Sequence, residues 1–147
     1  MKKEVSDAAQ SGDAKAAFYL GVMFRDGKGV EQDDTEAFKW FELGTRLGSA
    51  SSQNSLGMRY QNGQGVDRDL RKAQELFIKA DQQGDTDAGF NLATMYIFGL
   101  GVEQDDHTAI HWLERAASLG NQKAVEALRD NPTKYVRDYV GSHLRRR

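Results

Sequence analysis

The glycine residues of this chain recur at a fixed interval of 36 residues. The longest series consists of Gly12, Gly48, Gly84 and Gly120. Leucine, valine, aspartate and alanine positions follow the same interval, and residues 16–50 match residues 88–122 at 16 of 35 positions without a gap. A period between about 20 and 50 residues is typical of stacked repeats, in which each unit buries its apolar face against its neighbours. The period therefore constrains the fold more than any local motif.

Each repeat is expected to hold two α-helices. Apolar residues first stand four positions apart and then, after a glycine-rich break, three or four positions apart. Both spacings place the residues on one face of a helix. In the first repeat these residues are Ala16, Leu20 and Phe24, followed by Ala37, Trp40, Phe41 and Gly44. Small residues at the ends of the second stripe let neighbouring helices approach, and the central aromatic residues are expected to fill the space between them.

Glycine and aspartate mark the ends of these helices. The Gly-x-Gly-Val sequence that begins at Gly27 is expected to end the first helix, because glycine adopts the left-handed conformation that follows a helix end. Asp33 then stands at an N-cap position, and Glu36 completes a capping box. Asn131 followed by Pro132 predicts a last helix from about residue 132. The other expected helices span roughly residues 3–11, 14–26, 34–47, 50–62, 70–83, 86–98, 106–119 and 122–130.

These residues resemble the Sel1-like repeat, a family of the tetratricopeptide-type helical repeats. The shared pattern is Ala-x3-Leu-Gly-x2-aromatic-x2-Gly-x-Gly-Val-x2-Asp-x3-Ala-x2-Trp. The first copy consists of Ala16, Leu20, Gly21, Phe24, Gly27, Gly29, Val30, Asp33, Ala37 and Trp40. The second consists of Ser52, Leu56, Gly57, Tyr60, Gly63, Gly65, Val66, Asp69, Ala73 and Leu76. The third consists of Ala88, Leu92, Ala93, Tyr96, Gly99, Gly101, Val102, Asp105, Ala109 and Trp112.

The resemblance implies an all-α fold, a right-handed α/α superhelical solenoid of about three 36-residue helix-turn-helix repeats. We expect one domain over 1–147, with a half-repeat or cap at each end. An N-terminal cap helix occupies 1–12, repeats occupy 13–48, 49–84 and 85–120, and capping helices with a basic tail occupy 121–147. Tyr135, Val136, Tyr139, Val140 and Leu144 are expected to cover the open end of the last repeat, with a partner-docking helix as the alternative.

The resemblance also implies a non-enzymatic module that binds a protein or peptide partner as an adaptor, regulator or immunity-type protein. By analogy with tetratricopeptide grooves, the first helices are expected to line the concave face. The candidate binding residues are Lys15, Tyr19, Val22, Arg25, Ser51, Ser55, Met58, Gln61, Asp87, Asn91, Thr94 and Ile97. These positions vary between repeats while the core positions are held, which indicates a surface.

The composition excludes several kinds of site. The chain has no cysteine, so it has no disulfide scaffold, no thiol nucleophile and no cysteine-ligated metal. His107 and His111 have the spacing of two metal ligands on a helix, but the sequence places no third ligand beside them. We therefore expect surface histidines, with no metal and no cofactor. The alternatives are an enzyme built on the repeats, either β-lactamase-like or metal-dependent, and a fragment of a larger scaffold protein.

Charge and hydropathy bear on the partners. The formal net charge of −2 provides no basic field for nucleic acid. No apolar run approaches the ~20 residues of a membrane helix. Polar residues follow Met1-Lys2-Lys3 where a signal peptide would be apolar, so we expect a cytoplasmic protein. We also expect the chain to be a monomer. A periplasmic or secreted protein is the alternative if a signal peptide has been removed. Arg145-Arg146-Arg147 is expected to be a frayed basic end.

Overall fold

The structure is a computed structural model of the chain. It describes the backbone of residues 2–145 and the side chains of residues 2–143. The expectations for the side chains of Leu144 and Arg145, and for residues 146–147, lie outside the described part.

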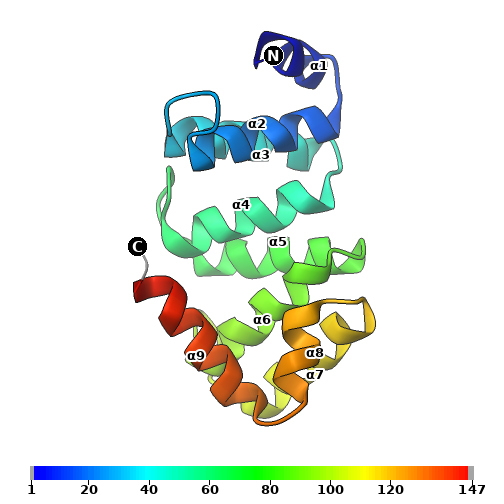
Figure 1. Ribbon diagram of the computed structural model, residues 1–147, viewed down its shortest axis with the longest axis vertical. Helices are drawn as coiled ribbons and strands as arrows, with labels where there is room; N and C mark the ends of the chain where they lie inside the picture. Colours follow the sequence, from blue (N-terminus) through cyan, green and yellow to red (C-terminus); the bar gives the residue numbers. More distant parts are fainter. Residues whose placement is uncertain (1, 146–147) are drawn as a thin grey trace. The chain divides into compact units, whose positions relative to one another are not determined.

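The described chain is helical and contains no strand (Figure 1). Its helices are α1 (Lys2–Gln10), α2 (Ala14–Asp26), α3 (Asp34–Arg46), α4 (Ala50–Asn62), α5 (Leu70–Gln82), α6 (Thr86–Phe98), α7 (Asp106–Ser118), α8 (Gln122–Leu128) and α9 (Pro132–Arg145). The expected helix boundaries agree with these to within one or two residues, which confirms the all-α repeat architecture. Over the described residues, none of the helices combines the length and the apolar character needed to cross a bilayer.

The helix ends form where the sequence predicts them. The carboxylate of Asp33 accepts a hydrogen bond from the Glu36 N–H at 3.1 Å, and Asp69 and Asp105 cap α5 and α7 in the same way. Hydrogen bonds from the backbone N–H and hydroxyl of Thr108 hold the pKa of Asp105 below its usual value. Gly27 follows α2 with φ of +69°, a left-handed conformation that strains every residue except glycine.

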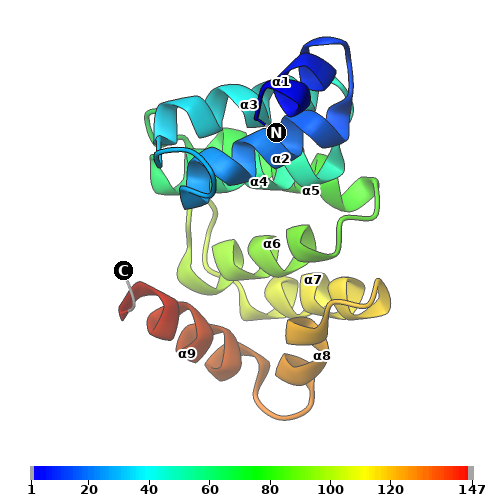
Figure 2. The ribbon, with the colours of Figure 1, turned by 45° about the horizontal axis from the view of Figure 1, so that its top comes forward.

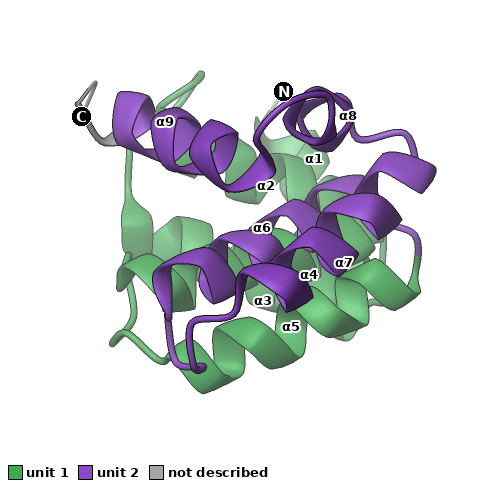
Figure 3. Cartoon of the chain, turned by 90° about the horizontal axis from the view of Figure 1, so that it is seen from below, with its two compact units in different colours: residues 1–83 green, residues 84–147 purple. Residues whose placement is uncertain are grey.

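The chain divides into two compact units, residues 1–83 and residues 84–147 (Figure 3). The division coincides with the boundary between the second and third repeats. Unit 1 contains α1 to α5, and unit 2 contains α6 to α9. A single domain over 1–147 stays a prediction.

In the first two repeats, the two helices pack tightly against each other at a glycine. In unit 1, a Cβ atom on Gly21 of α2 would overlap the ring of Phe41 of α3. A Cβ on Gly57 of α4 would lie 2.6 Å from the ring of Phe77 of α5. Both rings are fully buried. The third repeat carries alanine and leucine at the equivalent positions, and both are also fully buried. The larger residue on one helix is thus matched by a smaller one on the other.

The tryptophans contribute less to the core than the sequence suggests. Trp40 and Trp112 are both only partly buried. The indole N–H of Trp40 is itself enclosed, without a hydrogen-bond partner among the described residues. The side chains fully enclosed between the helices are Phe41 and its equivalents, one position later in the chain. The apolar stripe is therefore centred on the phenylalanine, because that position faces the glycine of the first helix.

The joint of the second repeat packs against the first repeat. A Cβ on Gly65 would overlap the backbone carbonyl of Asp34 at the start of α3. Gly65 has φ of +76°, so both its conformation and its surroundings exclude a side chain. The joint before α5 is thus held against the N-terminal end of α3 by backbone contact.

We expect Gly21→Ala to lower the free energy of unfolding by about 1–3 kcal/mol, because the methyl group overpacks against Phe41. Phe41→Leu in the same chain should recover most of this loss, since the third repeat pairs alanine with leucine. A double-mutant cycle by urea unfolding measures the coupling. Gly48→Ala is the control, because Gly48 has φ of +89° and open space around it. The loss of unfolding free energy that Gly48→Ala causes should therefore be the same with phenylalanine or leucine at position 41.

Candidate protein-binding surface

Two neighbouring first helices, α2 and α4, carry the candidate binding residues of unit 1 (Figure 1). We call this surface the α2–α4 face, and it consists of Lys15, Tyr19, Val22, Arg25, Ser51, Ser55, Met58 and Gln61. All eight residues are exposed or half-buried. Tyr19 has 61% of its surface exposed, the larger fraction of the two exposed large apolar side chains in the described chain. These residues thus lie on neighbouring helices and are accessible to solvent.

The apolar part of the α2–α4 face is broader than the sequence predicts. Phe18 is half-buried beside Tyr19, with the two ring centroids 6.0 Å apart. Val22 follows Phe18 by one helical turn, and Met58 occupies the position of Val22 on α4. Phe18 was not among the predicted residues, and it also packs against Phe41 of α3, with ring centroids 6.0 Å apart.

The positive charge of Arg25 is already paired with the carboxylate of its neighbour, Asp26. Its guanidinium donates hydrogen bonds to both carboxylate oxygens of Asp26, at 2.9 and 3.1 Å. The hydrogen bond from Arg25 lowers the pKa of the Asp26 carboxyl. Arg25 therefore presents a paired charge at the C-terminal end of α2. Lys15 is exposed at the other end of the helix.

A buried arginine lies directly next to Met58 in the sequence. Arg59 is 3% exposed and donates a hydrogen bond from Nη1 to Asp34 Oδ1 at 2.9 Å. Burial lowers the pKa of the Arg59 guanidinium, while the carboxylate of Asp34 acts in the opposite direction. The side chain of Asp34 is 43% exposed, so this ion pair lies at the edge of the buried region. Asp34 joins the start of α3 to α4 of the following repeat.

The equivalent face of α6 in unit 2 differs from the expectation. Ile97 is 1% exposed and belongs to the same apolar cluster as Val136 of α9. Thr94 is buried, and its hydroxyl donates to the Phe90 carbonyl at 3.0 Å. Asp87 is exposed but accepts a hydrogen bond from Asn121 Nδ2 at 2.9 Å.

Thr94 and Ile97 are thus removed from the accessible face, and Asp87 is already bonded within unit 2. Asn91 is half-buried. The predicted binding residues of the third repeat therefore do not form an open surface like the one on α2 and α4.

Helix α9 packs beside α6, α7 and α8 (Figure 2). The ring of Tyr139 contacts Phe90 of α6 edge to face, with centroids 5.5 Å apart. Lys123 lies over both rings, with Nζ 4.7 Å from the Phe90 centroid and 5.1 Å from that of Tyr139. Arg137 lies over Phe98, 5.6 Å from the ring centroid. Besides capping the last repeat, α9 therefore contacts the first helix of that repeat.

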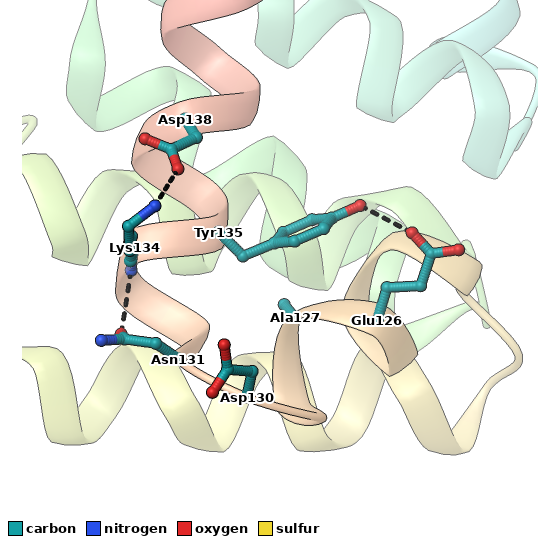
Figure 4. A pocket seen from close by; sticks show the side chains of 7 residues that line it. All are labelled: Glu126, Ala127, Asp130, Asn131, Lys134, Tyr135 and Asp138. Carbon is teal, nitrogen blue, oxygen red and sulfur yellow. Dashed lines mark hydrogen bonds and ion pairs between the residues drawn. The ribbon is translucent and has the colours of Figure 1, made fainter.

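A polar hollow of about 150 Å³ lies between α8 and the start of α9 (Figure 4). Tyr135 reaches across it and donates a hydrogen bond to Glu126 Oε2 at 3.0 Å. Burial raises the pKa of Tyr135, and the bond to Glu126 adds to this effect. Lys134 pairs with Asp138 at 2.7 Å on the same wall. These groups satisfy one another, so the hollow is part of the cap.

A second hollow, of about 300 Å³, lies between α1 and α2 in unit 1. Its lining is Glu4, Val5, Ala8, Asp13, Lys15, Ala16 and Tyr19. Lys15 and Tyr19 belong to the α2–α4 face, so this hollow extends that face toward the N-terminal end of the unit.

The histidine pair offers two of the ligands that a metal ion needs. The rings of His107 and His111 meet edge to face on α7, with centroids 4.8 Å apart. Over the described residues, no group of three or more His, Cys, Asp or Glu side chains is arranged to hold a metal ion.

The comparisons with known proteins identify the repeats. The model of the Sel1 repeat matches residues 14–49, 50–85 and 86–121. These three matches cover well over half of the chain, so the chain belongs to the Sel1 repeat family, whose helical repeats typically mediate protein–protein interaction. The matched segments begin one residue after the repeats expected from the glycine period. No match was found among curated proteins.

Solved structures agree with the family assignment. A Sel1 repeat protein from Oxalobacter formigenes is 34% identical, with a TM-score of 0.73 over 87% of this chain and 96% of that one. The protective antigen c5321 of uropathogenic Escherichia coli, which displays an SLR fold, is 38% identical with a TM-score of 0.76. The match covers 82% of this chain but only 26% of the antigen. Helicobacter pylori cysteine rich protein B is 27% identical, with a TM-score of 0.65 over 86% of this chain and 96% of that one.

We expect Arg59→Met to leave the free energy of unfolding unchanged or to raise it. Methionine occupies the equivalent positions 23 and 95. Asp34, whose side chain is 43% exposed, keeps its charge in water when Arg59 is replaced, while the cost of burying the guanidinium is removed. Arg59→Ala should instead cost about 2–4 kcal/mol, because it leaves a cavity. Urea unfolding of both variants tests this prediction. A larger loss of unfolding free energy in Arg59→Met than in Arg59→Ala would contradict it.

We expect Val136→Ala to loosen α9 from α6. Val136 is fully buried, so the truncation should cost about 1–3 kcal/mol. Hydrogen–deuterium exchange should accelerate over α9 and α6, while exchange in α2 to α4 stays unchanged. Val102→Ala, at a half-buried valine in the same unit, is the control and should leave α9 protected. Equal acceleration over the whole chain would show that α9 does not open separately.

Proposed function

We propose that this chain is a non-enzymatic protein-interaction module that binds its partner on the α2–α4 face. Tyr19 carries the proposal, because a large amphipathic side chain with 61% of its surface exposed has no role in the core. Tyrosine combines a large contact area with a hydrogen-bonding group and is enriched at binding hot spots. Phe18 and Val22 of the same helix and Met58 of α4 add half-buried apolar surface to this face.

The pattern of variation between repeats supports the same surface. Positions that contact the neighbouring helix keep their character in all three copies, as Leu20, Leu56 and Leu92 do. The position of Tyr19 instead carries serine in the second copy and asparagine in the third. Such positions are not needed for the repeat to fold, so they are available for recognition.

The partner is expected to be a protein or peptide with an apolar anchor and mixed charge. Arg25 and Asp26 form one paired charge at the end of α2, and Lys15 lies near the start. Complementary charges around an apolar centre would orient a partner and increase its association rate. We place the site on unit 1 because the equivalent residues of α6 are buried or bonded within unit 2.

Site-specific photo-crosslinking in the source cells tests this proposal. A benzophenone amino acid at position 19 or 58 should yield the same crosslinked protein, since both positions lie on the α2–α4 face. Positions 39 and 79 are the matched controls, because both are exposed lysines on second helices. Adducts from the control positions alone would contradict the assignment.

The affinity of the captured partner then measures the contribution of each side chain. Tyr19→Ala should weaken binding by about 1–4 kcal/mol if Tyr19 is a hot spot. It should leave the unfolding transition nearly unchanged, because Tyr19 is not part of the core. Lys39→Ala should alter neither quantity, and an effect of Lys39→Ala on affinity equal to that of Tyr19→Ala would remove the support for this face.

A further inference from the structure

Helix α9 lies on α6, the first helix of the third repeat (Figure 2). The ring of Tyr139 meets that of Phe90 edge to face, with centroids 5.5 Å apart. Nη2 of Arg137 donates a hydrogen bond to the Ile97 carbonyl at 3.5 Å, and the guanidinium lies over the ring of Phe98. Phe90 and Ile97 are 2% and 1% exposed. Unit 2 thus contains an example of a helix that covers the face of a first helix.

Phenylalanine stands at the same place on α2. Phe18 precedes Phe90 by two periods of 36 residues. Over the described residues of unit 1, the ring contacts of Phe18 are with Tyr19 and Phe41, which belong to its own repeat. Phe18 is only half-buried, whereas Phe90 is buried. The face that α9 covers on α6 is therefore accessible on α2.

A neighbouring first helix does not cover this face. Helix α4 lies next to α2, and its equivalents of Phe18 and Val22 are Asn54 and Met58. Both Asn54 and Met58 are still half-buried. First helices in series therefore leave the face accessible, and an additional helix across them is needed to bury it, as α9 does on α6.

We propose that the partner contributes an amphipathic α-helix that docks across α2 over Phe18, as α9 docks across α6 over Phe90. This inference rests on the proposed function and specifies the part of the partner that binds. The helix carries an aromatic residue that meets Phe18 edge to face. Helix α9 of a second copy is not the occupant, because it is already packed within its own unit, where Val136 is fully buried.

The charges of α2 distinguish the helix of the partner from α9. Asp26 stands where α6 has Phe98, so a basic residue at the place of Arg137 would share the Asp26 carboxylate with Arg25. Lys15 is exposed near the start of α2, where α6 carries an aspartate. The helix of the partner therefore carries a basic residue near the C-terminal end of α2 and an acidic residue near its start.

A synthetic peptide with the sequence of residues 131–145 is the probe, because it contains α9. Fluorescence anisotropy of the labelled peptide should show saturable binding to the full chain. Asp138 is exposed on α9, so alanine at this position of the peptide should change the affinity by less than about twofold. Proline at the same position breaks the helix and should abolish binding. Equal binding of the two peptides would show an extended occupant and would overturn the proposal.

Variants of the chain test the contacts on α2. Phe18→Asn introduces the residue of the second repeat and should weaken peptide binding by about tenfold or more. Phe38→Asn is the matched control, because it removes a half-buried phenylalanine from the second helix α3, and it should change the affinity by less than about twofold.

A gain of affinity keeps the test valid if Phe18→Asn alters the circular-dichroism melting curve. Asp26→Phe gives α2 the ring that α6 presents to Arg137. It should strengthen binding of the peptide by about threefold or more, since the peptide carries the same arginine. Unchanged affinity in Asp26→Phe would overturn the proposed register of the helix on α2.

Crosslinking locates the bound peptide. A benzophenone amino acid in place of Tyr139 in the peptide should attach to the tryptic fragment of residues 16–25, which contains Phe18. Attachment to residues 80–115 alone would show exchange with α9 on α6, and it would overturn docking on α2. Absence of binding would overturn it too, and photo-crosslinking from positions 19 and 58 in the source cells would still decide the proposed function.

Sedimentation equilibrium identifies a competing occupant. The chain alone should sediment with the mass of one copy. A dimer that Phe18→Asn dissociates and Phe38→Asn does not would make a second copy the occupant, and it would overturn the assignment to a partner protein.

Discussion

The ring of Phe41 occupies the place where a side chain on Gly21 would lie, and the two helices of the repeat pack against each other around this contact. Phe77 and Gly57 repeat the contact in the second repeat. Dispersion and burial stabilise the pair, and the missing Cβ fixes how closely the helices approach. A repeat protein repeats such a contact along the chain, so the match of residue sizes at this point recurs in each repeat.

The last repeat ends in a different way. Its successor begins as α8, but this helix stops at Leu128, and the chain returns as α9 beside α6. A cap must bury the apolar face of the last repeat without presenting a new one. Here α9 also covers part of α6, the first helix of the last repeat, through Tyr139 and Arg137. Covering the last repeat and leaving its first helix accessible therefore compete for the same helix face, and in this chain the accessible candidate residues lie on α2 and α4.

Most of the fold could be predicted from the sequence because it depends on local signals repeated in register. The aspartate caps, the glycine joints and the apolar stripes each specify a helix end or face without reference to distant residues. Tyr135, Val136 and Tyr139 lie in or against the apolar cluster of unit 2, on the side of the last repeat that the sequence analysis expected them to cover.

The candidate site could be predicted only in part, because burial on a first helix depends on non-local packing. Ile97 and Arg25 hold equivalent positions, yet α9 packs near one and solvent surrounds the other. The pairing of Arg59 with Asp34 joins residues in different repeats and has no signal in the period, since the equivalents of Arg59 are methionines.

The contact of Gly65 with the carbonyl of Asp34 has a consequence for how such a chain can change its length. Gly65 of this joint lies directly on the helix start of the preceding repeat, so an insertion at Gly65 would break that contact even though the neighbouring joint residues are exposed. Loops usually absorb insertions at little cost, because they lie at the surface. In this chain the joint instead acts as a spacer of fixed length. The chain can therefore most easily gain or lose whole repeats, which is consistent with three copies that align without a gap.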